Sequence, residues 1–343
     1  MTGTLRPAFI GVDVACRKGK HLPISICTWE EGRLVPLALR RLRIAPPRGD
    51  GNVSALDATK VQRFAHEAGA YIRGACEELS VTPTRIAIDA PRAPRRASLD
   101  RRRAEAAMND AGISCFSTPS RSEFKSIRRK VRRHLKRGGG PSTLPHANQL
   151  WMLVGFALFE ELEQVAPCIE VYPQAIVREL GAGRVHKSKP GAVQEQLVAA
   201  SRRTGWPVGQ VDKMSLAGIA WGSSHDQLDA YLAAWVAALH EADRKPFGRP
   251  PDDVIWVPRL SGEAPEVERT DRVVPFVPDT APDLNSRARP GPVVCPGCGQ
   301  HEFKRWPWGW DAHAAHKCRG LRGADSEERK SEYRSRFLKT ATP

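Results

Sequence analysis

Four aspartates lie where two short apolar segments end and where one apolar helix is expected to begin. Asp13 ends the segment "AFIGVD", Asp89 ends "RIAID", and Asp226 and Asp229 lie three residues apart in "HDQLDAYLAAW". A carboxylate is costly to bury without a partner, so acids beside apolar segments indicate either a specific pairing or a function. Carboxylate oxygens are the ligands that Mg²⁺ and Mn²⁺ prefer.

Clustered carboxylates of this kind can support hydrolysis of a phosphodiester. Two Mg²⁺ or Mn²⁺ ions held roughly 4 Å apart can activate water and stabilise the leaving oxygen. Each acid alone has an ordinary explanation as a turn residue, a helix cap or a favourable charge at a helix start. Asp229 fits these explanations least, because it lies inside the first turns of an apolar helix. The four acids together favour a metal site.

The elements that would position these acids follow from hydrophobic periodicity and from turn signals. We expect a strand over 8–16, a hairpin over 23–44, a helix over 54–79, a strand over 84–91, a helix over 98–112, a short strand over 113–116, a basic helix within 120–140, an apolar helix over 146–165, a strand over 168–173 and a closing helix over 223–241. The acids meet if the first and fourth strands are neighbours and the closing helix packs beside them. This arrangement is the ribonuclease H-like α/β plan, a mixed sheet flanked by helices.

Several motifs occur in the order seen in a known family. They are "GVDVA", "IAIDAPRAP", "RRRAEAAMNDAGISCFSTPSR", "IEVYPQAIVREL", "HKSKPG" and "HDQLDAYLAAW". Over about residues 8–241 the chain resembles the DUF429 family, predicted nucleases of ribonuclease H-like fold. The last motif is also similar to the closing helix of RuvC-type resolvases, in which a D-x-x-D pair supplies metal ligands. The resemblance implies that Asp13, Asp89, Asp226 and Asp229 form the acidic cluster, with Glu170 as a further ligand or a supporting acid.

The charge of the chain indicates a polyanionic partner. The 343 residues include 53 Lys and Arg against 38 Asp and Glu, a formal net charge of +15. The segment from Arg121 to Arg137 contains nine Lys or Arg and a single acid, Glu123. Although a charged helix is often only solvated surface, a run of one sign favours contact with the phosphates of DNA or RNA. The predicted contacts are Arg121, Lys125, Arg128, Arg129, Arg132 and Arg133, with Lys187 and Lys189 from a second segment.

The eight cysteines fall into two groups. Five are scattered over the first 170 residues, as expected of reduced, buried thiols, and three lie near the C-terminus. Cys295, Cys298, His313 and Cys318 give the spacing C-x2-C-x14-H-x4-C, which favours one tetrahedral, structural Zn²⁺, with His316 as an alternative third ligand. The lysine, arginine and tryptophans at 304–310 suit nucleic acid or a protein partner equally well.

Composition divides the chain into four parts. We expect a ribonuclease H-like domain over 1–243, a Pro-rich linker over 244–293 with one strand at "DVIWV", a zinc finger over 294–318 and a charged tail over 319–343. The longest apolar run, Leu150 to Phe159, is about half the length of a membrane span, so it predicts a core helix. The reduced cysteines and the absence of a leader-like segment predict a cytoplasmic protein without membrane contact.

Three functions are compatible with these patterns. The first is a metal-dependent nuclease with a zinc-finger accessory. The second is a nucleic-acid-binding protein that uses the same scaffold without cutting. The third is a phosphotransferase, because actin-like ATPases also place an acid at the end of the first strand. The segment "GVDVACRKGK" lacks the glycine-rich phosphate turn expected of that third class. The sequence does not indicate the oligomeric state.

Overall fold

The structure is a computed structural model that describes residues 5–182, 191–251, 253–260, 293–294 and 302–303. The chain divides into two compact units, Met1–Ala264 and Pro265–Pro343. The first unit contains nearly all of the described residues. Of the second, the structure describes only a two-stranded antiparallel pair, β8 (Val293–Val294) and β9 (Glu302–Phe303).

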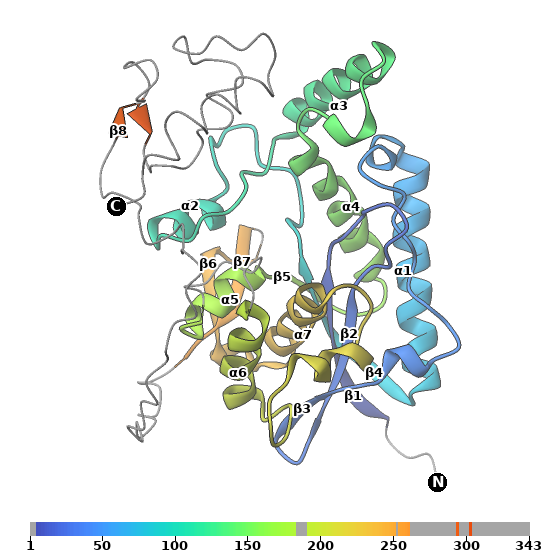
Figure 1. Cartoon of the computed structure of the whole chain (residues 1–343), viewed down its shortest axis with the longest axis vertical. Helices are drawn as coiled ribbons and strands as arrows, with labels where there is room; N and C mark the ends of the chain where they lie inside the picture. Colours follow the sequence, from blue (N-terminus) through green and yellow to red (C-terminus); the bar gives the residue numbers. More distant parts are fainter. Residues whose placement is uncertain (1–4, 183–190, 252, 261–292, 295–301, 304–343) are drawn as a thin grey trace, which may run out of the picture. The chain divides into compact units, whose positions relative to one another are not determined.

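A mixed five-stranded sheet forms the centre of the first unit (Figure 1). Its strands are β1 (Arg6–Asp13), β2 (Ile24–Glu30), β3 (Arg33–Pro36), β4 (Val81–Asp89) and β5 (Cys168–Glu170). Their order is β3-β2-β1-β4-β5, with β1–β2 and β2–β3 antiparallel and β1–β4 and β4–β5 parallel. The predicted hairpin is therefore confirmed, as is the predicted contact between the first and fourth strands.

Helices cover both faces of this sheet. They are α1 (Ala58–Glu78), α2 (Arg103–Asp110), α3 (Arg121–Lys136), α4 (Ala147–Leu162), α5 (Pro173–Glu179), α6 (Ala192–Thr204) and α7 (Ser224–Ala238). One apolar core joins α1 and α4 to the face that carries Ile10, Ile86 and Ile88. A second core joins α5, α6 and α7 to the opposite face. The sheet is thus the middle layer of three.

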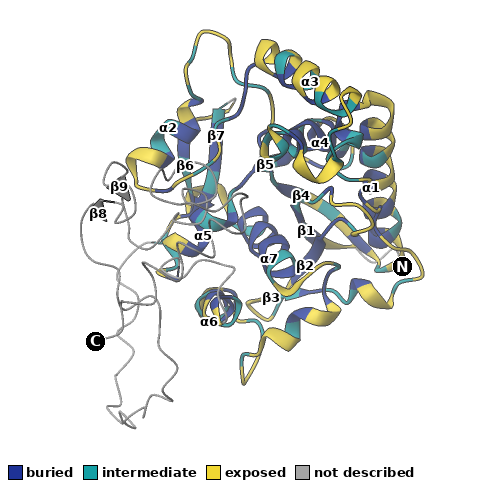
Figure 2. Cartoon of the chain, turned by 45° about the horizontal axis from the view of Figure 1, so that its top comes forward, coloured by how far each residue is buried: buried dark blue, intermediate teal, exposed yellow. Residues whose placement is uncertain are grey.

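The closing helix α7 is buried almost all round, as the dark blue ribbon of Figure 2 shows. It packs directly on β1 because Gly11 has no side chain. A Cβ added at Gly11 would lie 1.9 Å from the Ala230 carbonyl oxygen and 2.3 Å from the Ala234 nitrogen. Only glycine permits such a close approach of strand and helix backbones. The apolar sequence of α7 therefore reflects its position between the sheet and the second core.

The first residues of the predicted linker over 244–293 have regular structure. Residues from Arg244 onward form an antiparallel hairpin of β6 (Arg244–Arg249) and β7 (Asp253–Pro258), and Trp256 of β7 forms a bridge with Val171. This hairpin belongs to the first unit, which extends to Ala264. The strand expected at "DVIWV" is present, but its partner "RKPFGR" was missed because proline and glycine there resemble a linker.

Two further local predictions were wrong. Residues 113–116 were expected to form a strand but lie in an irregular loop. The helix expected from residue 98 begins at Arg103, and Arg102 before it has extended backbone and a buried side chain. In both cases the local apolar pattern was overridden by contacts made elsewhere in the fold, which are described below.

The five cysteines of the first unit are free, and all but the half-buried Cys115 are buried. Burial raises the pKa of Cys16 to about 11 and that of Cys27 to about 12. At neutral pH these thiols are therefore protonated and unreactive, as predicted for core cysteines. Within the described ranges, none of the helices has the length and apolar character needed to cross a membrane.

Candidate active site

Asp13 and Asp89 are paired with each other at the carboxyl ends of two parallel strands. The register of β1 and β4 runs from Phe9 opposite Arg85 to Asp13 opposite Asp89. Because paired residues of parallel strands point to the same face and neighbouring strands lie about 4.8 Å apart, the two carboxylates emerge side by side. Gly11, two residues before Asp13, faces α7, so the aspartates also lie on the α7 side of the sheet.

The first turns of α7 lie level with this aspartate pair. Gly11 contacts α7 at Ala230 and Ala234. Moving two residues along the strand to Asp13 covers about 6.6 Å, the rise of between four and five helix residues. Phe9 lies two residues before Gly11, so the same spacing places Phe9 level with about residue 236 of α7. Arg85, the partner of Phe9 on β4, donates to the Ala237 carbonyl oxygen at 2.9 Å, which agrees with this position. The start of α7 that contains Asp226 and Asp229 is thus brought to the end of the sheet.

Asp226 occupies the third position of α7 and forms a capping box with Ser223. Its Oδ2 accepts hydrogen bonds from the Ser223 backbone nitrogen at 2.9 Å and from the Ser223 hydroxyl at 2.6 Å. His225 Nε2 lies 3.1 Å from the other oxygen. A Cβ at Gly222 would touch both Asp226 and Pro23, and the Pro23 carbonyl accepts from the Asp13 nitrogen at 3.1 Å. The start of α7 is thereby connected to the end of β1.

Asp229 is only 5% exposed, in agreement with the expectation that it lies inside the packed part of α7. In the described part of the chain, no group of three or more His, Cys, Asp or Glu side chains is already gathered in an arrangement that could hold a metal ion. The edge of the sheet therefore presents a paired set, Asp13 and Asp89, with two further acids supplied by the adjacent helix.

Glu170 belongs to an ion pair that was not predicted. It lies at the end of β5, is 6% exposed and accepts one hydrogen bond of 2.8 Å on each carboxylate oxygen from the guanidinium of Arg102. The backbone nitrogen of Arg92 donates to it at 2.9 Å. Burial raises the pKa of Glu170, and the ion pair with Arg102 opposes that rise. A metal ion would have to compete with Arg102 for both oxygens.

Arg102 connects three separate segments. Its guanidinium also contacts Asp253 at 3.1 Å and lies 3.9 Å from Glu105. Burial alone would lower the pKa of Arg102, but Glu170, Glu105 and Asp253 raise it above its usual value, so the guanidinium stays charged. This side chain therefore joins α2, β5 and β7. Its sequence context "DRRRAE" did not indicate a buried ion pair, because three consecutive arginines are typical of a solvated surface.

A hollow of about 40 Å³ opens beside Asp89. Its polar lining includes Glu170 and Arg102, and its aromatic lining consists of Phe116, Trp151 and Tyr172. Phe116 is 54% exposed, an unusual position for a large apolar side chain. The hollow thus places aromatic surface next to one member of the aspartate pair.

The basic helix α3 is strongly amphipathic. Phe124, Ile127 and Val131 are buried, whereas most of its basic residues are exposed. Figure 2 shows the exposed parts of α3 in yellow. Among the described residues no acid forms an ion pair with an exposed cation within 121–137; the acid Glu123 pairs with Arg95. The predicted contacts Arg121, Lys125, Arg129, Arg132 and Arg133 are exposed, whereas Arg128 is half-buried. Arg132 also donates to the Leu56 carbonyl at 3.2 Å.

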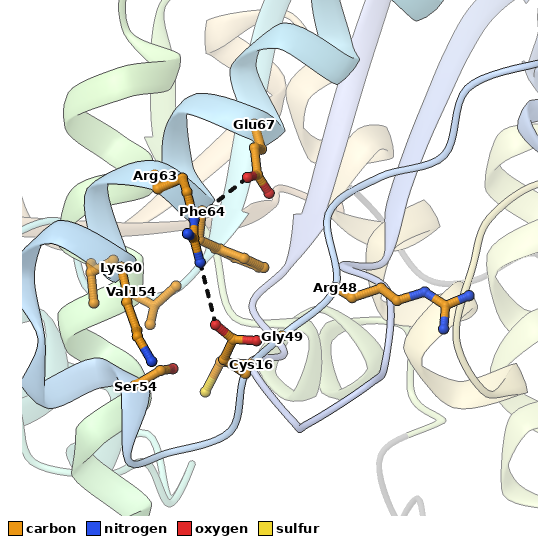
Figure 3. A pocket seen from close by; sticks show the side chains of 11 residues that line it. Cys16, Arg48, Gly49, Ser54, Lys60, Arg63, Phe64, Glu67 and Val154 are labelled. Carbon is orange, nitrogen blue, oxygen red and sulfur yellow. Dashed lines mark ion pairs between the residues drawn. The ribbon is translucent and has the colours of Figure 1, made fainter.

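A second hollow, of about 220 Å³, lies beside the loop that follows β1 (Figure 3). Cys16 of that loop lines it together with Arg48, Lys60 and Arg63. Arg63 lies between two acids, 3.6 Å from Asp50 and 3.7 Å from Glu67, which offset much of the positive charge. This hollow therefore has mixed charge, whereas the exposed cations of α3 pair with no acid in the described part of the chain.

Comparison with known families places the chain in one of them. The family model described as "Protein of unknown function (DUF429)" matches residues 39–253. This chain belongs to the DUF429 family. No curated protein and no solved structure matches it.

The DUF429 match includes Asp89, Glu170, Asp226 and Asp229 and continues into the β6–β7 hairpin. It begins after β3, so Asp13 precedes it, whereas the motifs of the sequence indicated a resemblance from about residue 8. The predicted phosphate contacts Lys187 and Lys189, and the predicted zinc ligands Cys295, Cys298, His313 and Cys318, lie outside the described residues of this DUF429 protein.

Proposed function

We propose that this DUF429 protein is a metal-dependent nuclease that hydrolyses phosphodiester bonds of DNA or RNA. The observation that carries the proposal is the pairing of Asp13 with Asp89 at the end of two parallel strands, level with the first turns of α7. Carboxylates fixed to strand ends and a helix start are held by rigid elements, as a catalytic metal site requires.

The topology supports a ribonuclease H-like assignment. Three antiparallel strands, β1 to β3, continue into the parallel strands β4 and β5 in the order β3-β2-β1-β4-β5. This is the arrangement that the ribonuclease H-like plan requires for its acids to meet. Because one fold can host many functions, the topology supports the scaffold and the acids support the chemistry.

The donor set fits Mg²⁺ or Mn²⁺. Both ions take hard oxygen ligands, and Mg²⁺ binds through a few carboxylates together with substrate phosphate. Asp13 and Asp89 would hold the ions, with Asp226 and Asp229 completing the set when a phosphate is present. Bound metal would supply an activated water and charge stabilisation for the leaving oxygen. Asp226 would have to exchange its hydrogen bonds to Ser223 for this role.

The exposed cations of α3, which pair with no acid that the structure describes, support a nucleic-acid substrate. Release of condensed counterions by Lys and Arg is the main source of affinity for a phosphate backbone. One observation also favours the alternative of a non-catalytic nucleic-acid-binding protein. The described acids are not already gathered in a group of three, and Glu170 is engaged by Arg102.

The decisive experiment incubates the full chain with labelled DNA and RNA, single-stranded, duplex and branched, in Mg²⁺, Mn²⁺ or EDTA. The nuclease proposal expects cleavage that EDTA abolishes and that Asp13→Asn and Asp89→Asn remove. Asp110→Asn is the matched control, since Asp110 is exposed at the end of α2. Binding without cleavage under every metal condition would instead support the non-catalytic alternative.

We further propose that Cys295, Cys298 and Cys318, with His313 or His316, hold one structural Zn²⁺ in a cytoplasmic protein. The donor spacing supports this, because thiolates and imidazole favour tetrahedral Zn²⁺. The module would aid recognition of nucleic acid or of a protein partner. Elemental analysis should find one zinc per chain, and Cys298→Ser should lower that ratio while cleavage of short substrates persists.

A further inference from the structure

Phe116 is held in an exposed position by contacts on both sides of it. On one side, the Tyr172 hydroxyl donates to the Ser114 carbonyl at 3.1 Å. On the other, the Thr118 backbone nitrogen donates to Glu105 at 3.0 Å, and the Thr118 hydroxyl donates to the same oxygen. Glu105 and Thr118 are both buried. The backbone around Phe116 is therefore fixed while its ring stays 54% exposed.

The Phe116 ring lines the hollow beside Asp89. Trp151 and Tyr172 line the same hollow, and the Trp151 indole donates to the Asn148 carbonyl at 2.9 Å, which orients the ring. Exposed aromatic side chains on fixed backbone offer stacking surface at little cost in conformational entropy. Because the hollow is small, it can accept the edge or face of a planar group but not a whole folded segment.

Charge next to the hollow indicates which planar group would bind. The basic helix α3 begins at Arg121, shortly after the Phe116 loop, and Ser120 at its start forms a bridge with Arg95. Arg95 also donates to the Thr118 carbonyl at 3.3 Å. Aromatic surface beside a row of cations is the combination that binds single-stranded nucleic acid, with bases stacking on rings and phosphates contacting the cations.

We propose that Phe116 is a stacking platform for an unpaired base of the nucleic-acid strand that lies across Asp89. The inference rests on the proposed function and extends it, because it makes the substrate single-stranded, or locally unpaired, at the site of cleavage. Bases within a duplex are already stacked on each other and do not offer a face to the ring. Phe116 would therefore select for unpaired strands, whereas α3 binds phosphates of any strand.

The test measures binding of the full chain in EDTA to a single-stranded oligonucleotide, a duplex of the same sequence and a base-free phosphodiester strand of the same length. Phe116→Ala is expected to weaken single-strand binding by roughly 5- to 150-fold, the loss that removal of one base–aromatic stack causes. Binding of the duplex and of the base-free strand should change by less than about twofold. Phe116→Tyr keeps the ring and should bind like the unaltered protein.

Two controls keep the test decisive. Val208→Ala removes another exposed apolar side chain, 63% exposed, in a loop elsewhere. Phe116→Leu keeps the apolar volume without the ring and should behave like Phe116→Ala. A 2-aminopurine base in the single strand should be quenched on binding to the unaltered protein and less so with Phe116→Leu.

Unchanged single-strand affinity in Phe116→Ala, or an equal loss for duplex and base-free strand, would overturn the stacking inference and leave the proposed function standing. If the unaltered protein binds none of the three probes in EDTA and also cleaves no nucleic acid in Mg²⁺ or Mn²⁺, the proposed function fails and the stacking inference fails with it.

Discussion

Gly11 of β1 lies against the backbone of α7 so closely that a Cβ there would be 1.9 Å from the Ala230 carbonyl oxygen. This contact sets the distance between strand and helix, and with it the position of Asp226 and Asp229 relative to Asp13. The backbone of Ala230 is part of a buried helix and cannot move aside cheaply. The identity of residue 11 is thus tied to the geometry of the candidate site.

Gly11→Ala is therefore expected to destabilise the first unit. Overpacking of this kind costs about 1–3 kcal/mol and more when backbone must shift. Urea unfolding measures the change, with Gly218→Ala as the control because a Cβ at Gly218 meets nothing within 4 Å. Equal midpoints for the two variants would show that α7 does not pack on β1 as described.

Metal ions should stabilise the protein through the aspartate pair. An ion that binds only the folded state raises the free energy of unfolding by about 2.7 kcal/mol at 100 times its dissociation constant. We expect Mn²⁺ or Mg²⁺ to raise the melting temperature of the unaltered chain and of Asp110→Asn. Asp13→Asn and Asp89→Asn should lose this shift. A shift of the same size in all four proteins would locate the metal elsewhere.

The sheet could be predicted from the sequence because its signals are local. The turn signal "EEG" between two apolar segments gave the β2–β3 hairpin, and the acids at the ends of β1 and β4 indicated that these strands are neighbours. Ion pairs between distant segments were not visible in the sequence. Arg102 and Glu170 are far apart in the sequence, and each has an ordinary local context.

The conformation of the loop over 113–116 also depends on contacts that the local sequence does not reveal. Its apolar residues favour a strand, but it is not part of the described sheet. The Tyr172 hydroxyl donates to the Ser114 carbonyl instead, and Glu105 accepts from the Thr118 nitrogen just beyond the loop. The exposed Phe116 could not be recognised from the sequence either, since a lone phenylalanine in an apolar run predicts burial. Such residues are found only when the contacts of their neighbours are known.

Removing Arg102 should leave Glu170 as a buried, unpaired acid. Loss of one partner of a buried ion pair typically costs about 3–5 kcal/mol. Arg102→Met is expected to lower the free energy of unfolding by this amount, as measured by urea unfolding. Arg103→Met replaces the exposed neighbour and should change the free energy of unfolding little. Adding Glu170→Met to Arg102→Met should recover part of the loss. It should not recover all, because Asp253 and Glu105 also lose their ionic contacts with Arg102.

Glu123 should make the stability of α3 depend on pH. Hydrogen bonds from the Ser120 backbone and side chain hold the pKa of Glu123 below its ordinary value of 4.5. A lowered folded-state pKa means that the stabilisation is complete above 4.5 and is lost as the pH falls through the folded-state pKa. Glu123→Gln keeps a capping side chain without the charge. The difference in free energy of unfolding between the unaltered protein and Glu123→Gln, measured by urea unfolding, should disappear at acidic pH. A difference that does not change with pH would contradict the lowered pKa of Glu123.

The exposed cations of α3 should determine the salt dependence of nucleic-acid binding. Each phosphate contact contributes a slope of about 0.9 for duplex DNA or 0.7 for a single strand in a plot of log affinity against log salt concentration. Arg129→Ala with Arg133→Ala is the informative pair, because Arg128 is half-buried and Arg132 bonds Leu56. We expect this double variant to reduce the slope by at most the contribution of two phosphate contacts. Arg202→Ala with Arg203→Ala, two exposed arginines on α6, is the matched control and should keep the slope of the unaltered protein. If both pairs behave alike, the charge of α3 serves only to solvate the helix.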